Sequence, residues 1–477
     1  MPDTLPNTSL AALLAEIRVI TGDRGLLTEP SDTAAYAEDW RKLFQGSTPA
    51  VIRPGSTEEL AAVVAACARA GVALVPQGGN TSMVAGATPS ADGSELVLSL
   101  ARMNRIRLVD PVDLTLTLEA GCTLKAAQNA AAEAGCLLPL SISSEGTAQI
   151  GGVLATNAGG NNTVRYGNAR DLVLGLEVVL PDGQIWNGLR RLRKDNTGYC
   201  LRQLFVGSEG TLGVITAAVL KLVPQPVETA VALCSVGSAQ SALDLFTRFN
   251  RHDPAAIQAF EYMSGAGMDF VLRHIPGATL PCAAAGHYAL IELATPRANA
   301  GLREALEEVL ATAMEDEIVL DAVIAESEAQ RAALWKLREE HAEAQKREGA
   351  SVKNDVSVPV SRVPELLDRA AVAGEALIPG MRMVPFGHMG DGNIHLNFEQ
   401  PVGMDAAAFL AQDHDIMDMV GAIVRDLDGS FSAEHGVGRL KPYMMPEWRG
   451  GAELDTMRRI KQALDPLGLM NPGKVLP

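Results

Sequence analysis

Cysteine is scarce in this sequence and is not arranged for disulfide pairing or metal binding. Only 6 of the 477 residues are Cys, and no two of them form a C-x-x-C pair. Scattered single cysteines are typical of reduced thiols in a reducing compartment. We therefore expect a cytoplasmic protein without structural disulfides.

Long apolar segments are also missing. No uncharged apolar run reaches about 18 residues, the length that a bilayer-spanning helix needs. The first residues, MPDTLPNTSLAALLAEIRVI, do not place a basic stretch before an apolar core. We therefore expect neither a membrane span nor a signal peptide.

Positive charge is in deficit. The chain holds 40 Lys and Arg against 57 Asp and Glu, for a formal net charge of −17. An acidic surface repels phosphate backbones, which argues against a nucleic-acid partner. An anionic substrate would need an Arg or Lys placed locally in its site.

Two nucleotide-binding fingerprints are absent. No predicted strand is followed by G-x-G-x-x-G, so the Rossmann mode of NAD binding lacks its signature. No G-x-x-x-x-G-K-[ST] occurs either, which excludes a P-loop ATPase.

The length predicts two or three domains, because one compact core does not grow to this size. Residues 1–45 read as a helical lead-in, in which Asn7 or Thr8 could cap a helix running through Ile17. A break falls at 223–227, where VPQPV carries two prolines.

One helix has clear start and stop signals. Ser56 and Glu59 have capping-box spacing, and Gly71 follows the apolar pattern as a C-terminal stop. Before the break we expect strands at 96–100, 114–120 and 176–183, the last turning at Asp182-Gly183. Beyond it, strands at 231–236, 288–294, 318–325 and 352–358 alternate with helices. This pattern predicts an α+β domain with a mixed or antiparallel sheet.

Three glycine-rich polar loops stand out, at 76–86, 143–167 and 204–216. The first directly follows a predicted strand, and glycines there let the backbone approach a ligand. Successive free N–H groups in such a turn form an anion nest that suits a pyrophosphate. One such loop could be an ordinary turn, but three favour a phosphate-containing cofactor.

The segment VPFGHMGDGNIHLNF (384–398) predicts a metal-binding hairpin. Taking Asp391-Gly392 as a two-residue turn places His388 directly opposite His395. Directly opposed Cβ atoms lie roughly 4.5–5.5 Å apart, so the two imidazoles could share one metal ion. Glu434 or His435 in SAEHGVGR would supply the third ligand, and His₂Glu with an open position is a catalytic set.

These motifs together resemble a known family. PQGGNTS, NAGGNN, RKDNTGYCLRQLFVGSEGTLGVIT, GHMGDGNIHLN, EHGVGRLK and the terminal NPGK are similar to FAD-linked D-2-hydroxyacid dehydrogenases. That group includes D-2-hydroxyglutarate and D-lactate dehydrogenases and the glycolate oxidase flavoprotein subunit. The resemblance covers roughly residues 40–477.

The resemblance implies an α+β fold: a vanillyl-alcohol-oxidase-type FAD-binding domain of two subdomains with an α+β, ferredoxin-like cap. The expected limits are a lead-in at 1–45, an FAD-binding domain at 46–225, a substrate or cap domain at 226–425 and a segment at 426–477 returning to the flavin. We expect FAD contacts from Pro76, Gln77, Gly78, Gly79, Asn80, Thr81, Ser82, Gly146, Thr147, Gly151, Gly152, Thr156, Asn157, Gly159, Gly160, Ile215 and Asn471.

The resemblance also implies roles for site residues. His388, His395 and Glu434 would hold a divalent metal, usually zinc in this family. His435 would be the general base, and Arg338, Lys353 and Asn397 would bind the substrate. An ordinary ion pair on a helix surface is the alternative for Arg338, but no acid lies three or four residues away.

Two departures from the family's patterns matter. Residues 76–89 contain no His, the residue to which many sugar oxidases of this fold attach FAD, so we expect noncovalent FAD. Ala342 stands one helical turn after Arg338, where hydroxyglutarate enzymes place a Thr. This weakens the expectation of a substrate with a second carboxylate.

The implied reaction is oxidation of a small D-2-hydroxy acid to the 2-oxo acid. The metal would assist proton removal by His435, and hydride would pass to flavin N5. An electron-transfer flavoprotein or a quinone would accept the electrons, and a homodimer is expected. The alternatives are an O₂-using oxidase of the same fold, a noncatalytic flavoprotein subunit, and a metal-binding module without flavin.

Overall fold

The computed structural model describes residues 9–477, and its chain divides into two compact units. The first unit comprises the chain up to Gly159, Asn168–Gln225 and Glu434–Pro477. The second comprises Gly160–Gly167 and Pro226–Ala433. Among the described residues, no helix is both long and apolar enough to cross a bilayer. The domain limits expected from the sequence stay a prediction.

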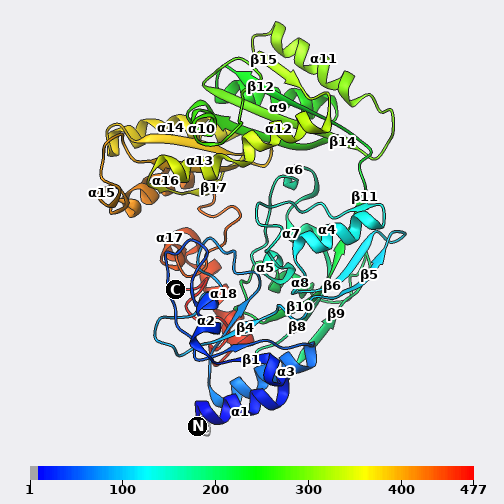
Figure 1. Cartoon of the computed structure of the whole chain (residues 1–477), viewed down its shortest axis with the longest axis vertical. Coiled ribbons are helices and arrows are strands. Elements are labelled where there is room, and N and C mark those ends of the chain that lie inside the picture. The colour runs from blue at the N-terminus through cyan, green and yellow to red at the C-terminus, as the bar shows by residue number, and fades with distance from the viewer. Residues whose placement is uncertain (1–8) are drawn as a thin grey trace. The chain divides into compact units, whose positions relative to one another are not determined.

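The first unit contains three sheets, and its elements can be followed in Figure 1. A mixed four-stranded sheet has the order β1-β2-β4-β3, and a five-stranded antiparallel sheet has the order β5-β6-β10-β8-β9. The third pairs β11 with β7. The strands are β1 Leu26–Leu27, β2 Val51–Ile52, β3 Leu74–Gln77, β4 Leu96–Ser99, β5 Ile106–Asp110, β6 Thr115–Glu119, β7 Cys136–Leu137, β8 Val173–Val179, β9 Ile185–Gly188, β10 Val214–Lys221 and β11 Val223–Pro224.

Helices cover these sheets, and most are short. They are α1 Leu10–Thr21, α2 Pro30–Ala37, α3 Thr57–Ala70, α4 Leu124–Glu133, α5 Ile150–Ala155, α7 Ala169–Leu172, α8 Arg202–Phe205, α17 Met445–Arg449 and α18 Ala452–Leu464. Turn segments η1 Asp23–Gly25 and η4 Pro442–Met444 are 3₁₀ helices.

The capping signals of α3 are confirmed. The Ser56 hydroxyl accepts the N–H of Glu59 at 3.2 Å, and Gly71 ends the helix with φ 68° in the left-handed region. The Glu59 carboxylate accepts the N–H of Gly55 at 2.7 Å, which closes the box one residue earlier than the standard motif.

The expected start of the first helix is wrong. Ser9 caps α1, with its hydroxyl accepting the N–H of Ala12 at 3.3 Å, and the helix extends to Thr21 instead of Ile17. Asn7 and Thr8 lie outside the described residues. Ser9 competes equally well for the cap because Ser, Thr and Asn satisfy the same free N–H groups.

The second unit is built on one eight-stranded antiparallel sheet. Its order is β15-β12-β14-β13-β18-β19-β16, and β17 also pairs with β19. The strands are β12 Glu228–Val236, β13 Ile257–Ser264, β14 His287–Thr295, β15 Val319–Ile324, β16 Ser351–Val352, β17 Asp355–Ser357, β18 Arg382–His388 and β19 Asn393–Glu399. The sequence predicted β12, β14 and β15, merged β16 with β17, and missed β13.

Helices lie on both faces of this sheet, as Figure 1 shows within the unit. Phe246 of α9 contacts Phe260 of β13 on one face, with ring centroids 5.1 Å apart. On the other face, Leu334 and Leu337 pack with Met263 in a buried apolar cluster. The helices are α6 Thr163–Tyr166, α9 Ala239–His252, α10 Gly265–His274, α11 Leu302–Glu315, α12 Glu328–Glu339, α13 His341–Glu348, α14 Val363–Leu377, α15 Ala406–Leu410 and α16 Asp413–Asp426, with η2 Val360–Arg362 and η3 Met389–Asp391 as 3₁₀ segments.

The hairpin at β18–β19 forms, but its predicted register is wrong. His388 pairs with Asn393, and Phe386 pairs with His395. The connection is the four-residue segment 389–392, which contains η3 and ends at Gly392 with φ 84°. The carboxylate of Asp391 accepts the N–H of Asn393 at 3.0 Å, so Asp391 ends a 3₁₀ turn and is not the first residue of a two-residue turn.

The corrected register keeps both histidines on one face of the hairpin. His388 and His395 are diagonal neighbours, and diagonal neighbours remain within reach of ring side chains. Their ring centroids lie 5.6 Å apart. The shift of register therefore changes which residues are opposed and leaves the histidine pair together.

Candidate active site

The glycine loop after β3 offers a row of backbone N–H groups. Within residues 9–477, none of the N–H groups of Gly78, Gly79, Asn80, Thr81 and Ser82 donates a hydrogen bond to protein. A Cβ added at Gly79 would stand 1.9 Å from the carbonyl oxygen of Thr147. The first and second loops therefore touch at a point that only glycine permits, beside free donors that suit a phosphate.

The third loop and the C-terminal segment join these two. The Asn471 amide donates to the carbonyl oxygens of Gly86 and Glu209, at 2.9 and 2.7 Å. The Glu209 carboxylate accepts the N–H groups of Val437 and Gly438, at 2.7 and 2.9 Å. The structure thus assembles all three predicted loops and the end of the chain.

Several of the predicted FAD residues already have protein partners. The Gln77 side chain donates to the carbonyl oxygens of Tyr36 and Ala87, and that of Asn80 to Glu38. The Asn157 side chain accepts the N–H of Arg170. These side chains hold the shape of the loops, which leaves backbone groups as the donors for a ligand. Ile215 is buried next to a bulge in β10.

The other predicted FAD residues lie along and after α5. Gly151 and Gly152 belong to this helix, Thr156 follows it, and Gly160 falls in the second unit. No described protein atom lies within 4 Å of a Cβ added at Gly152, so one side of α5 is open.

The predicted metal ligands converge. One ligand atom from each of His388, His395 and Glu434 lies within 4.8 Å of the others. Glu434 directly follows Ala433, whose N–H donates to the backbone oxygen of Asp355 on β17 at 3.2 Å.

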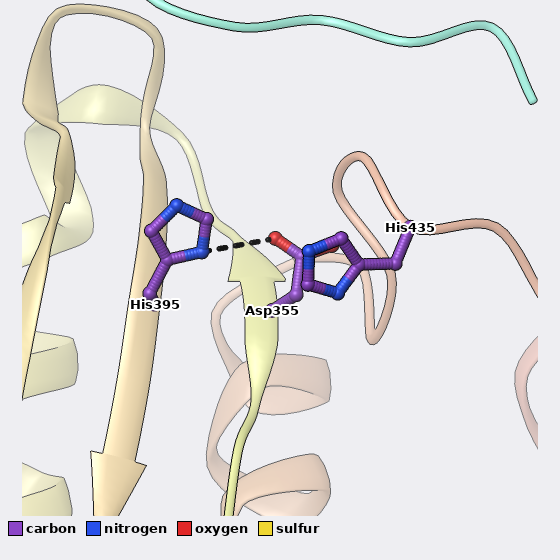
Figure 2. A group of neighbouring side chains, drawn as sticks. All are labelled: Asp355, His395 and His435. Atoms are coloured by element: carbon purple, nitrogen blue, oxygen red, sulfur yellow. Dashed lines mark ion pairs between the residues drawn. The ribbon is translucent and has the colours of Figure 1, made fainter. Parts of the chain in front are cut away.

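A second group shares His395 with the first. Ligand atoms of Asp355, His395 and His435 also lie within 4.8 Å of one another. Figure 2 draws these three side chains, and its dashed line marks the ion pair between the Asp355 carboxylate and Nδ1 of His395 at 3.6 Å. Asp355 also accepts the Asn393 side-chain amide at 2.9 Å. Sequence reasoning missed Asp355, although it stands in the VKNDVSV segment that was predicted as a strand.

Arg338 does not lie on a helix surface. It is 6% exposed, and its Nε donates to the Glu261 carboxylate of β13 at 2.6 Å. The other oxygen of Glu261 lies 2.7 Å from Nδ1 of His388. Burial by itself raises the pKa of the Glu261 carboxyl, but the charges of Arg338 and His388 outweigh it and lower that pKa to about 2. Sequence reasoning missed Glu261 because it missed β13.

Lys353 and Asn397 meet at a buried amide that sequence reasoning also missed. The side-chain oxygen of Gln345 accepts Lys353 Nζ at 3.1 Å and the Asn397 amide at 2.9 Å. The amide of Gln345 donates to the carbonyl oxygen of Val384 on β18 at 3.1 Å. Gln345 thereby holds two predicted substrate residues beside the hairpin.

Comparisons with known proteins agree with this architecture. Residues 48–188 match the FAD binding domain family, and residues 225–475 match the C-terminal domain of FAD linked oxidases. The chain is 39% identical to a D-2-hydroxyglutarate dehydrogenase of Xanthomonas citri pv. viticola over 94% of each chain. It is 38% identical to the mitochondrial D-2-hydroxyglutarate dehydrogenase of Bos taurus over 98% of this chain and 83% of the relative.

Solved structures show the fold class. A p-cresol methylhydroxylase structure aligns with TM-score 0.77 at 15% identity, over all of this chain and 98% of the other. An alkyldihydroxyacetonephosphate synthase aligns with TM-score 0.73 at 16% identity, over 98% and 86%. These structures therefore show a fold of the vanillyl-alcohol-oxidase type, and the two family matches define an FAD-linked oxidoreductase. Within that class, the chain belongs to the family of FAD-dependent D-2-hydroxyacid dehydrogenases.

Proposed function

We propose that this enzyme oxidises a D-2-hydroxy acid of the D-2-hydroxyglutarate class to its 2-oxo acid. Relatives that bear the name D-2-hydroxyglutarate dehydrogenase support the substrate class. The observation that carries the proposal is the convergence of His388, His395 and Glu434, joined through Glu261 to the buried guanidinium of Arg338. A metal-type donor set and a carboxylate-binding cation in one group suit a 2-hydroxy acid.

His388, His395 and Glu434 would hold the metal. Two imidazole nitrogens and one carboxylate are a zinc-type set that leaves a position open. The ion would act as a Lewis acid that lowers the pKa of the substrate hydroxyl. The fit rests on the nature and convergence of the donors.

His435 would take the hydroxyl proton. It follows the ligand Glu434 directly in the chain and is followed by Gly436, whose φ is 80°. A base next to a ligand can face the same substrate oxygen from a neighbouring direction. Proton removal by a positioned side chain contributes typically 10²–10⁴-fold to a rate.

Arg338 would bind the substrate carboxylate. Glu261 occupies its Nε, and within residues 9–477 its two terminal nitrogens make no hydrogen bond to protein. They form the planar fork that matches a carboxylate. Lys353 and Asn397, held by Gln345, would bind the remaining polar groups of the substrate.

FAD would bind through the backbone N–H groups of Gly78–Ser82 and the open side of α5. Bound FAD supplies the two-electron acceptor for the oxidation. Because residues 76–89 contain no His, we propose that it is held noncovalently. Acid precipitation should release all flavin into the supernatant, and flavin retained in the pellet would disprove this.

D-lactate is the alternative substrate, because Ala342 offers no hydroxyl for a second carboxylate. We further propose an electron-transfer flavoprotein or a quinone as electron acceptor, a homodimer, and a cytoplasmic location. Several animal and plant relatives carry the word mitochondrial in their names. An O₂-using oxidase would differ by producing peroxide stoichiometrically when the reduced flavin is reoxidised in air.

Stopped-flow flavin reduction by D- and L-2-hydroxyglutarate and D-lactate tests the proposal. We expect the D-diacid to reduce the flavin fastest and a chelator to abolish reduction while the flavin spectrum persists.

His435→Asn should keep FAD and metal and slow reduction by about 10²–10⁴-fold. Glu434→Ala should lose metal and rate together. A near-normal rate in metal-replete His435→Asn would remove the base assignment, and full activity without metal would remove the metal site.

A further inference from the structure

The two oxygens of one buried carboxylate connect the proposed metal site with the proposed carboxylate site. Glu261 lies on β13, between β14 and β18, and its side chain is fully buried. One oxygen lies 2.7 Å from Nδ1 of His388, and the other accepts Nε of Arg338 at 2.6 Å. A charged group without solvent contact is retained at a site only when its partners compensate it, and here both partners belong to the proposed site.

Through the oxygen that faces Nδ1, Glu261 determines how His388 can bind a metal. A carboxylate at Nδ1 keeps the proton on that nitrogen, so Nε2 is the nitrogen that remains for a metal. Carboxylate partners of this kind fix the ring and raise the basicity of the ligand. The bond therefore both aims and strengthens one of the three metal ligands.

Through its other oxygen, Glu261 determines how Arg338 can bind a carboxylate. By holding Nε, it leaves the two terminal nitrogens as a fork for an incoming carboxylate. The ring of Phe386 lies under the guanidinium, with 4.9 Å between Cζ and the ring centroid. Two constraints from neighbouring strands thus fix the plane of the guanidinium before substrate arrives.

Asp355 provides an internal comparison. Its carboxylate faces Nδ1 of the other histidine, His395, at 3.6 Å, and it also accepts the neutral amide of Asn393. Asp355 is therefore placed to orient a metal ligand without bonding to the arginine. Glu261 therefore joins its histidine to the charged Arg338, whereas Asp355 joins its histidine to the neutral amide of Asn393.

We propose that Glu261 is a positioning residue that sets the metal ligand His388 and the substrate-binding Arg338 together, so that both sites depend on one carboxylate. The inference rests on the proposed function, because it assumes that His388 binds metal and Arg338 binds substrate. It goes beyond that function by naming a residue that touches neither ligand and determines the geometry of both.

The test compares Glu261→Asp with two matched variants. Glu261→Asp keeps the charge but shortens the side chain, so that one carboxylate no longer reaches both partners. Asp355→Asn changes the carboxylate beside His395 and leaves the Glu261–Arg338 pair intact. Arg338→Lys keeps a positive charge beside Glu261 and removes the planar fork. For each protein, zinc affinity is measured by competition with a chromogenic chelator, and KM for D-2-hydroxyglutarate is measured at saturating zinc. Flavin absorbance and the thermal midpoint report folding.

We expect Glu261→Asp to weaken zinc binding by about 10–100-fold, the usual effect of losing a partner of a ligand. We also expect KM to rise about 10-fold or more at saturating zinc, the usual effect of losing a hydrogen bond to a charged group. Asp355→Asn should weaken zinc binding with KM unchanged, and Arg338→Lys should raise KM with zinc affinity unchanged. A Glu261→Asp enzyme that changes only one of the two quantities would overturn the inference.

A double variant covers the case in which Glu261→Asp fails to fold. Glu261→Gln combined with Arg338→Met removes both charges, so no buried charge is left alone. Its zinc affinity should still fall about 10–100-fold, and an unchanged affinity would overturn the inference. If the wild-type enzyme itself neither binds zinc nor loses activity with a chelator, the proposed metal site fails, and that result is distinct because it needs no variant.

Discussion

Each unit of the molecule buries one glutamate that organises a predicted site, and the two glutamates behave in opposite ways. Glu209, in the first unit, accepts two backbone N–H groups, and burial outweighs these bonds and raises the pKa of its carboxyl to about 7. Glu261, in the second unit, faces Arg338 and His388, and its pKa is lowered to about 2. Neutral donors satisfy the hydrogen-bonding capacity of a buried carboxylate without fully stabilising its negative charge. Positively charged partners satisfy the hydrogen bonds and also stabilise the charge.

The contrast extends to the rest of each unit. The predicted cofactor loops present backbone N–H groups and glycines, which suit a ligand that brings its own phosphate charges. The hairpin site presents imidazoles, carboxylates and a guanidinium, which suit a metal ion and a small charged substrate. Shape is therefore the main requirement in the first unit, and compensation of charge in the second.

Replacing each glutamate by glutamine should give the largest difference in stability between the two units. Glu261→Gln leaves Arg338 as an uncompensated buried charge, so we expect the free energy of unfolding to fall by about 3–5 kcal/mol. Glu209→Gln loses about one hydrogen bond to a neutral donor, and we expect a fall of about 1–2 kcal/mol. Denaturant unfolding of both variants at pH 7 measures the difference. Equal losses would show that the type of partner does not matter.

A substitution at Gly79 should disrupt the predicted cofactor loops of the first unit by steric overlap, without any change of charge. Gly79→Ala puts a methyl group 1.9 Å from the carbonyl oxygen of Thr147, and we expect a loss of about 3 kcal/mol, the upper end of usual overpacking costs. Flavin content should fall with it. Gly152→Ala is the matched control, because no described protein atom lies within 4 Å of the new methyl group. It should leave the apoprotein stable and weaken FAD binding, and unaltered FAD affinity would place the cofactor elsewhere.

A smaller effect should appear as pH dependence in the second unit. His341 is fully buried, its Nδ1 lies 2.8 Å from the Leu337 oxygen, and its Nε2 has no hydrogen-bond partner among the described residues. Burial, and then the charge of Arg338, lowers its pKa from 6.5 to about 3. The stability that this neutral His provides is present above pH 6.5 and is lost as pH falls below that value.

At pH 5 the loss should amount to about 2 kcal/mol relative to pH 7. His341→Leu should remove that part of the acid-side loss, whereas His252→Leu, at an exposed position, should keep it. Unfolding free energies at the two pH values decide between them. If the wild-type protein and both variants lose the same unfolding free energy between pH 7 and pH 5, the lowered pKa of His341 does not cause the acid-side loss.

The site shows where prediction from sequence succeeded and where it failed. The glycine loops, the histidine hairpin and the caps of α3 were predicted, because glycine, turn and capping preferences act over a few residues. The hairpin register was wrong, because Asp391 accepts the N–H of Asn393 and extends the turn to four residues. The length of the turn depends on this single hydrogen bond, which the residue types alone do not reveal.

Residue patterns alone identified the FAD-linked family, placed His388 and His395 in one hairpin, and showed that the nucleotide-binding fingerprints of other classes are absent. The contacts of Glu261, Asp355 and Gln345 with the predicted site residues became visible only in the packing of the strands and helices. IQAFEYMS (257–264) is mostly apolar, and a lone Glu within it gave no sign of its partners. Those partners, Arg338 and His388, lie 77 and 127 residues further along the chain. Pairing over such separations depends on how strands and helices pack, which local residue patterns do not specify.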